Sequence, residues 1–332
     1  MSDTLALHMK NIPSRQRRGF LQDALTLSIL SSVGVFNAAF AADNGREFRV
    51  GWQKGSNLAI LKARGNLDAH LKREGWRIKW VEFTAGPQML EGLNVGSIDF
   101  ACVGETPPIF AQAAGADLRY VASEPPAPRA EKILVPGNSA IRSVSELKGK
   151  RVALNRGSNV HYQIVKALER AGLKYADVDI KLLPPSDARA AFENGTIDAW
   201  VIWDPFAEAA IGQIGARVLE TAEGVALNYN FYLSTGDFTR NRSDVLQWAI
   251  EEIKATDDWV QNNFDAAADI LAPQISLSRE ITRNALRNYS YGVAPLDARA
   301  IGNQQTIADT FTELKLIPKK LDVASVVWKP PA

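Results

Sequence analysis

The sequence predicts two α/β lobes joined by two crossings, and two observations carry this prediction. Strand-like and helix-like segments alternate through most of the chain, which is typical of α/β proteins. The tetrapeptide KGSN at 54–57 also recurs as RGSN at 156–159, and further along the chain the segment 96–108 is matched by 195–206. This second pair aligns without a gap at Gly96/Gly195, Ile98/Ile197, Asp99/Asp198 and Glu105/Asp204. Matched features in the same order indicate two lobes built on one plan.

Residues 1–41 have the pattern of a signal peptide. An apolar run at 24–36 is followed by the small-residue pattern Ala-Phe-Ala at 39–41, and it is preceded by the basic residues Arg15, Arg17 and Arg18. The run is too short to span a bilayer, so we expect cleavage near Ala41 and export to the periplasm. The segment RRGFL at 17–21 also fits a twin-arginine signal, which leaves the general secretory and twin-arginine routes open.

After the signal, strand-like runs and helical patterns follow one another. Unbroken apolar runs are typical of strands covered by helices on both faces. The strand-like runs, several of them unbroken and apolar, lie at 48–53, 77–83, 98–103, 118–123, 132–136, 151–155, 180–184 and 199–203. Helical periodicity is found at 58–75 and 160–173, each ending near a glycine, and the chain becomes mostly helical after residue 243.

Two segments are predicted to connect the lobes. The proline-rich stretch SEPPAPRAE at 123–131 is expected to form a stiff crossing, and a return crossing is expected near 227–234. These positions place lobe I at 42–125 and 228–332 and lobe II at 126–227.

The repeated tetrapeptides lie where a strand is followed by a helix. Ligands of parallel α/β sheets gather at such joints, and a helix N-terminus presents N–H groups that hold an anion without a formal cation. Thr106-Pro107 and Asp204-Pro205 repeat the pattern of a cap followed by proline at a helix start. We therefore expect four helix starts, two from each lobe, to face one cleft.

Composition excludes several other functions. Residues 1–41 hold four basic and two acidic side chains, so removing their +2 from the total of +1 leaves a mature chain near −1. A chain of this charge is not drawn strongly to nucleic acid or to anionic membranes. Cys102 is the only cysteine, which excludes an intrachain disulfide, and it lies in an apolar run as a small buried residue would. HExxH, GxSxG and P-loop motifs are absent from the sequence.

Several long segments resemble the aliphatic sulfonate-binding proteins, which are periplasmic components of ATP-binding-cassette importers. The resemblance rests on QKGS (53–56), VEFTAGPQMLEGLNVGSIDF (81–100), PPIFAQAAGADLRYVASEPP (107–126), DARAAFENGTIDAWVIWDP (187–205) and IPKKLDVASVVW (317–328). It implies a type II periplasmic-binding-protein fold whose lobes close on an alkanesulfonate for sulfur acquisition and then dock on an inner-membrane permease. We also expect a monomer that is not an enzyme, with no cofactor, no metal and no nucleic-acid partner.

The resemblance also implies which residues face the ligand. These are Gln53, Gly104, Glu105, Thr106, Ser158, Asn159, Trp203 and Asp204, with Ser56, Arg129, Gly157 and Tyr232 as weaker candidates. Trp203 is the expected apolar wall for an alkyl tail, whereas Arg129 either pairs with the sulfonate or stays solvated in the first crossing. The family usually has Asp in place of Glu105 and Ser in place of Asn159, which leaves the preferred sulfonate open.

Two other classes of protein share this fold. A synthase of pyrimidine precursors would be expected to lack a signal peptide and to use His and Cys, but the mature chain holds only His70, His161 and Cys102. A sensor domain would need an attached DNA-binding or signalling segment. The importer component is the function that the sequence favours.

Overall fold

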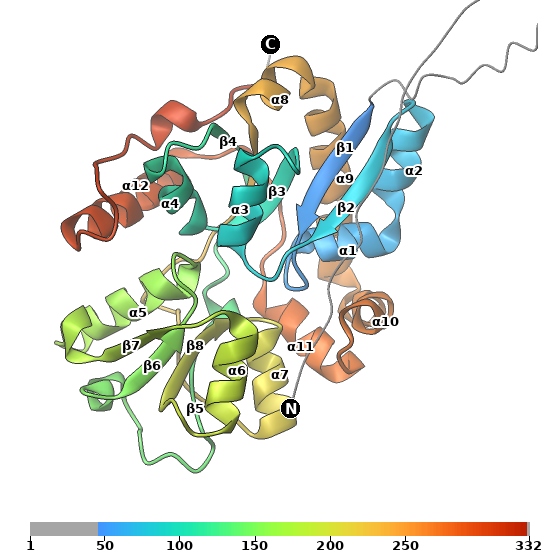
Figure 1. The fold of residues 1–332 in the computed structure, drawn as a ribbon. Coiled ribbons are helices and arrows are strands. Elements are labelled where there is room, and N and C mark those ends of the chain that lie inside the picture. The colour runs from blue at the N-terminus through green and yellow to red at the C-terminus, as the bar shows by residue number, and fades with distance from the viewer. Residues whose placement is uncertain (1–45, 331–332) are drawn as a thin grey trace, which may run out of the picture. The chain divides into compact units, whose positions relative to one another are not determined.

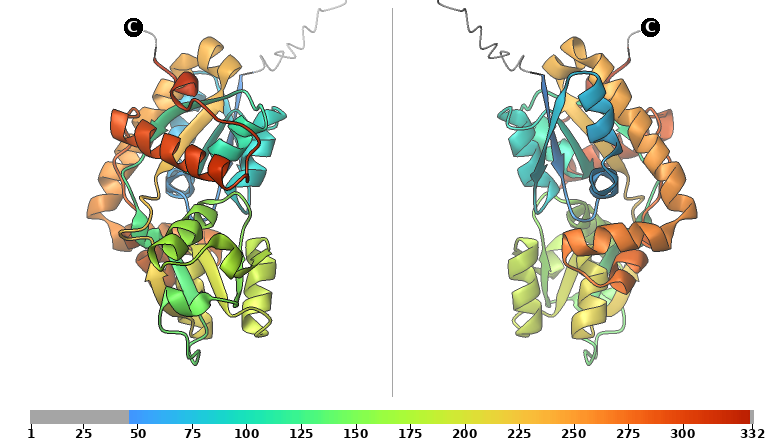
Figure 2. Two further views of the ribbon diagram at one scale, coloured as in Figure 1. Left: turned by 90° about the vertical axis from the view of Figure 1, so that its left-hand side faces the viewer. Right: turned by 90° about the vertical axis from the view of Figure 1, so that its right-hand side faces the viewer.

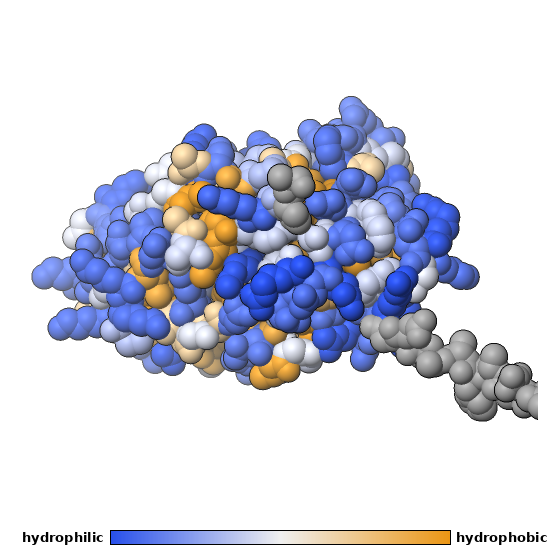
Figure 3. Space-filling model, turned by 90° about the horizontal axis from the view of Figure 1, so that it is seen from above, coloured by the Kyte–Doolittle hydropathy of each residue, from blue (hydrophilic) through white to orange (hydrophobic). Residues whose placement is uncertain are grey.

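The protein forms two five-stranded sheets, each covered by helices (Figure 1). The structure is a computed structural model, and it describes residues 46–330. The predicted signal peptide therefore lies outside the described residues. Within the described range, no helix is both long and apolar enough to cross a membrane. The face of the molecule in Figure 3 is mostly hydrophilic, with apolar residues in small separate patches.

The sheet of lobe I has the strand order β2-β1-β3-β10-β4. Its strands are β1 Glu47–Trp52, β2 Arg77–Glu82, β3 Phe100–Gly104, β4 Leu118–Ser123 and β10 Asn230–Thr235. β1 pairs in parallel with β2 and β3, while β10 is antiparallel to both β3 and β4. β10 follows the strands of lobe II in the sequence and then joins the sheet of lobe I. Lobe I is therefore built from two separate parts of the chain.

The sheet of lobe II repeats this arrangement with the order β7-β6-β8-β5-β9. Its strands are β5 Glu131–Val135, β6 Arg151–Leu154, β7 Asp179–Leu182, β8 Ala199–Trp203 and β9 Arg217–Thr221. Here β5 is the antiparallel strand between β8 and β9. Each predicted lobe thus has its own sheet, while the exact lobe boundaries stay a prediction.

Helices cover both faces of each sheet. Lobe I carries α1 Asn57–Arg64, α2 Asn66–Arg73, α3 Gly86–Asn94, α4 Pro107–Ala113, α8 Gly236–Asn241, α9 Ser243–Asn262, α10 Phe264–Ile275, α11 Arg279–Asn288 and α12 Ala298–Glu313. Lobe II carries α5 Asn159–Arg170, α6 Pro185–Glu193 and α7 Phe206–Ile214. α10 and α11 extend alongside lobe II, and α11 packs on α7 (Figure 2).

Alternate residues of the inner strands pack into different cores. On β3, Phe100 and Cys102 join one apolar cluster, while Ala101 and Val103 join a second cluster across the sheet. β8 divides its side chains in the same way between two clusters of lobe II. Because successive side chains point to opposite faces, an unbroken apolar run is what a strand buried on both faces requires.

One sequence-based expectation about the elements was wrong, and a second extended too far along the chain. The helix expected at 58–75 is broken at Gly65, whose φ of 71° lies in the left-handed region, so α1 and α2 form in its place. The return crossing expected at 227–234 ends at Tyr229, because the residues that follow form β10 with Phe231 and Leu233 on one face and Tyr232 on the other.

The two crossings are hydrogen-bonded to each other, and both lobes belong to one compact unit. The Ala127 N–H donates to the carbonyls of Leu227 and Asn228, both at 3.1 Å. The Asn228 side chain returns a hydrogen bond from Nδ2 to the Ala127 carbonyl at 2.8 Å. Asn228 has a φ of 53°, which a residue with a short polar side chain tolerates. The connection between the lobes is therefore a paired segment with its own internal bonds.

The internal repeat appears as the same ionic clamp in each lobe. Arg49 reaches Asp99 through Nε at 2.9 Å, and Arg151 reaches Asp198 through Nε at 3.0 Å. In both clamps the arginine backbone N–H also donates to the aspartate, at 2.8 Å. Each clamp ties the start of one strand to the turn before a neighbouring strand, which fixes the register of the parallel pair.

Replacing either aspartate with alanine should destabilise its lobe. The bidentate contact and the backbone hydrogen bond predict a loss of about 1–3 kcal/mol for Asp99→Ala and for Asp198→Ala, with the larger loss at the more buried Asp99. The double variant should lose the sum within about 0.5 kcal/mol, because the clamps lie in different lobes. Urea unfolding checks this. A double variant no less stable than either single variant would contradict it.

Candidate functional site

A cleft with about 460 Å³ of atom-free space, including solvent, lies between the lobes. Its lining comes from the ends of β1, β3 and β8, the starts of α1, α3, α4 and α5, the start of β5, and the second crossing. The lining residues are Gln53, Gly55, Ser56, Gly86, Cys102, Gly104, Pro107, Glu131, Ser158, Asn159, Trp203, Asn228, Asn230 and Tyr289. Of the predicted residues, Gln53, Ser56, Gly104, Ser158, Asn159 and Trp203 are among them.

The two repeated tetrapeptides form matching turns at this cleft. The Ser56 Oγ donates to the Gln53 carbonyl at 3.0 Å, and the Ser158 Oγ donates to the Asn155 carbonyl at 2.7 Å. Neither serine side chain makes a capping hydrogen bond to its helix. Both hydroxyls bond to the turn before the helix and not to N–H groups of the first helical turn. The N-termini of α1 and α5, which carry the positive ends of the helix dipoles, therefore lie at the cleft without a side-chain cap.

Asn159 links the two lobes at the cleft floor. Its Oδ1 accepts a hydrogen bond from the Thr106 backbone N–H at 3.1 Å, and its Nδ2 donates to Asn228 Oδ1 at 2.6 Å. A Cβ on Gly104 would lie only 1.9 Å from Asn159 Nδ2. Glycine at position 104 is therefore required for this close approach, and Thr106 contributes through its backbone while its side chain is buried.

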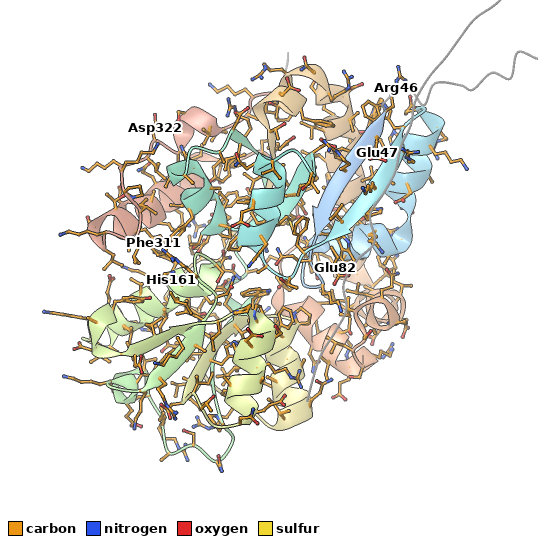
Figure 4. All side chains as sticks on the ribbon, in the orientation of Figure 1. Arg46, Glu47, Glu82, His161, Phe311 and Asp322 are labelled. Atoms are coloured by element: carbon orange, nitrogen blue, oxygen red, sulfur yellow. The ribbon has the colours of Figure 1, made fainter. Side chains whose placement is uncertain are left out.

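A second close approach joins the lobes at the rim. A Cβ on Gly55 would lie 2.1 Å from the carbonyl oxygen of Asp204, which is backbone and cannot rotate away. The same carbonyl accepts a hydrogen bond from the Tyr289 hydroxyl at 2.5 Å. At the opposite side, the His161 ring on α5 lies 5.4 Å from the Phe311 ring on α12 (Figure 4).

Asp204 lies outside the cleft lining, in an ionic network of lobe II that Asn288 of α11 joins. Its Oδ2 accepts hydrogen bonds from Lys132 Nζ at 2.7 Å and from Asn288 Nδ2 at 2.8 Å, and its Oδ1 accepts from the Glu208 N–H at 3.1 Å. Burial raises the pKa of Asp204 to about 6, although Lys132 opposes the shift. Its carboxylate thus has three donors of its own and is not part of the cleft lining.

Glu105 also lies outside the lining. Its Oε2 accepts hydrogen bonds from the Tyr229 N–H at 3.0 Å and from Asn303 Nδ2 at 3.2 Å. The side chain is fully buried, and burial raises its pKa to about 7. The sequence analysis expected Glu105 and Asp204 to face a ligand directly. In the structure both carboxylates instead point into buried hydrogen-bond networks within the protein.

Three of the weaker candidates are also placed away from the cleft. Tyr232 is buried in the core of lobe I, where its hydroxyl donates to Glu124 at 2.6 Å. Arg129 is exposed and donates to the Arg287 carbonyl at 3.4 Å, in line with the solvated alternative. Gly157 is outside the lining; it has a φ of 69°, and a Cβ there would contact the Phe110 ring.

The sequence did not single out several residues of the lining. Glu131 begins β5 beside the first crossing, and a charged residue at a strand start is ordinarily solvent-exposed. Asn228, Asn230 and Tyr289 come from segments far from the repeated motifs. No local pattern marks them, because they reach the cleft only through the antiparallel return of β10 and the position of α11.

Cys102 is buried, as expected, and burial raises the pKa of its thiol. Its backbone carbonyl, at the cleft, accepts a long hydrogen bond of 3.5 Å from Gln53 Nε2. Among residues 46–330, no group of three or more His, Cys, Asp or Glu side chains is placed to hold a metal ion.

Comparison with known proteins places the chain in a family. Residues 70–267 match the family model described as NMT1/THI5 like. The chain is 39% identical over 313 residues to a protein of Escherichia coli (strain K12) named as an aliphatic sulfonates-binding protein, covering 93% of this chain and 98% of that one. The chain belongs to the family of aliphatic sulfonate-binding proteins.

Two further relatives agree with this placement. A protein of the same name from Bacillus subtilis (strain 168) is 33% identical over 94% of both chains. The solved alkanesulfonate-binding protein of Xanthomonas axonopodis pv. citri, bound to MOPS, is 40% identical and has a TM-score of 0.82, covering 85% of this chain and 98% of that one. These relatives are binding proteins, and the match confirms both the predicted resemblance and the periplasmic-binding-protein fold.

Gly55→Ala should force the lobes apart at the rim. The added Cβ meets backbone of the opposite lobe, so we expect a measurable rise in the radius of gyration by X-ray scattering and a loss of about 1–3 kcal/mol in unfolding free energy. Gly302→Ala is the matched control, since nothing lies within 4 Å of its added Cβ inside α12. The control should be neutral or up to about 1 kcal/mol more stable. Equal behaviour of the two variants would contradict the close approach.

Glu105 should make stability fall as pH rises. The unfolded chain loses the Glu105 proton near pH 4.5 while the folded chain keeps it up to about pH 7, so the stabilising contribution of Glu105 is fully present below pH 4.5 and is lost between these values. The shift corresponds to at most about 3 kcal/mol. Glu105→Gln should flatten this part of the profile in urea unfolding at pH 5 and pH 8. Exposed Glu91→Gln is the control, and an unchanged slope in Glu105→Gln would refute this role.

Proposed function

We propose that this protein is an extracytoplasmic substrate-binding protein that captures aliphatic sulfonates between its lobes and delivers them to an ATP-binding-cassette importer. The observation that carries the proposal is the cleft itself, where the starts of α1 and α5 approach from different lobes with their serine side chains engaged elsewhere. Helix N-termini and amides provide several donors, and a sulfonate has three acceptor oxygens.

The charges of the lining suit an anion that must be released again. None of the lining residues in the described part of the chain is Lys, Arg or His. Neutral donors hold an anion without the strong Coulomb attraction of a buried ion pair. Trp203 and Tyr289 provide aromatic surface on the same cleft for an alkyl tail. The named relatives bind ligands of this class, which supports the assignment to sulfonates.

The remaining parts of the proposal follow from the sequence and the family. The predicted signal peptide supports a periplasmic location, and the proposed partner is the inner-membrane permease of the importer, with sulfur acquisition as the role. We propose a monomer without affinity for nucleic acid. We also propose that the protein is not an enzyme, since Cys102 is buried with its thiol pKa raised and the described lining brings no histidine near it.

Alkanesulfonates should stabilise the protein more than carboxylates of equal chain length. A tetrahedral head with three acceptors satisfies more converging donors than a planar head with two. Thermal unfolding with ethanesulfonate, propionate, sulfate and nitrate at equal concentrations measures this, because the stabilisation grows with the logarithm of ligand concentration over the dissociation constant. The assays must avoid buffers that are themselves sulfonic acids. Propionate or nitrate acting as strongly as ethanesulfonate would overturn the proposed ligand class.

A further inference from the structure

Glu131 is a buried acid placed at the ligand cleft. It is the first residue of β5 and only 1% of it is exposed, yet it lines the cleft. Its strand partner across the antiparallel pair is Trp203. Directly opposite residues of an antiparallel pair project from the same face of a sheet, so the carboxyl group and the indole belong to the same wall.

One oxygen of this carboxyl group is left without a partner inside the protein. The Asn159 side chain partly offsets the rise in the pKa of this carboxyl group, but Oε2 is buried and has no hydrogen-bond partner. The neighbouring Lys132 does not serve it, since Lys132 Nζ contacts Asp204 at 2.7 Å and Glu208 at 3.2 Å. A buried polar oxygen without a partner is costly, and a ligand in the cleft is what can satisfy it.

The ionisable groups around Glu131 give it no positive partner. Glu105, in the turn after β3, repels a charge on Glu131, and Tyr289, after α11, is the other ionisable group that interacts with it. Cys102, from β3, is a third ionisable member of the lining, and its thiol is uncharged. Burial and Glu105 together raise the pKa of Glu131 well above its ordinary value. The surroundings thus favour the neutral acid, which carries an O–H donor.

A sulfonate has acceptor oxygens only. An ionised Glu131 likewise has only acceptors and would repel the ligand, whereas the neutral acid donates a hydrogen bond. We propose that Glu131 is a specificity-determining residue that contacts the anionic ligand as a neutral acid, donating a hydrogen bond from Oε2 to a ligand oxygen, so that the anion binds together with one proton. This proposal rests on the proposed function of the cleft as a sulfonate site.

The proposal predicts a pH dependence that the ligand itself cannot cause, because a sulfonate stays ionised through the neutral range. Below the pKa of Glu131 in the free protein the affinity is constant, since the proton is already present. Above that pKa the dissociation constant rises about tenfold per pH unit, because one proton must be taken up. Glu105 and Asp204 also have raised pKa values, about 7 and about 6, so a variant at Glu131 is needed to assign the effect.

Titration calorimetry with ethanesulfonate between pH 6 and pH 9 tests the proposal. Proton uptake is obtained at each pH from two buffers of different ionisation enthalpy, neither of them a sulfonic acid. Wherever the affinity of the wild-type protein falls with rising pH, the fall should be matched by proton uptake that approaches one proton. Glu131→Gln keeps an N–H donor but cannot titrate, so its affinity should be independent of pH and its proton uptake absent. Glu105→Gln should retain the uptake.

Two results would overturn the proposal. The first is ethanesulfonate binding by Glu131→Ala at pH 6 that is as tight as binding by the wild-type protein, because this variant lacks the proposed donor. The second is selective weakening of 2-aminoethanesulfonate in Glu131→Gln with ethanesulfonate unaffected, which would make Glu131 an ionised partner for a ligand ammonium. A third outcome tests the proposed function and not the role of Glu131. If ethanesulfonate fails to bind the wild-type protein at every pH while another anion binds, the assignment to sulfonates is wrong.

Discussion

The hydrogen bonds of Asn159 hold together the features on which the cleft depends. This one side chain begins α5 in lobe II, accepts from the Thr106 N–H of lobe I and donates to Asn228 in the second crossing. Asn228 in turn bonds the first crossing at Ala127. The amide thus joins both lobes and both crossings, and Gly104 leaves the space it needs. Asn159, Asn228 and Gly104 also line the cleft, so the contact between the lobes and the cleft share these residues.

Three buried acids surround the cleft, and each is compensated differently. Asp204 has Lys132 and Asn288 as donors, and Glu105 has a backbone N–H and Asn303. Glu105 and Glu131 each keep one buried carboxyl oxygen without a hydrogen-bond partner, but of the three acids only Glu131 lines the cleft. Desolvation penalises a carboxylate that lacks donors, so Glu131 is the acid whose charge state a ligand in the cleft can influence.

The sequence by itself determined the architecture, because that depends on local patterns. Apolar runs and glycines at helix ends are short-range signals, and the aligned Asp99 and Asp198 of the internal repeat appear in the structure in matching clamps with Arg49 and Arg151. The repeated tetrapeptides likewise predicted that Ser56, Ser158 and Asn159 face one cleft. A strand-to-helix turn places its side chains at the sheet edge whatever the rest of the chain does, so these positions were predictable.

Only the tertiary structure decided which side chains face the ligand cleft. From the sequence, Glu105 and Asp204 were expected to face the ligand just as Ser158 was. In the structure they are buried and bonded to residues distant in the chain, Glu105 to Asn303 and Asp204 to Lys132. Glu131 was not predicted, because its neighbours in the sequence do not bury it. It is buried by the strand that pairs with β5 and by the other lobe. The fate of a charged group depends on desolvation and on partners far away in sequence, and neither is encoded in a local pattern.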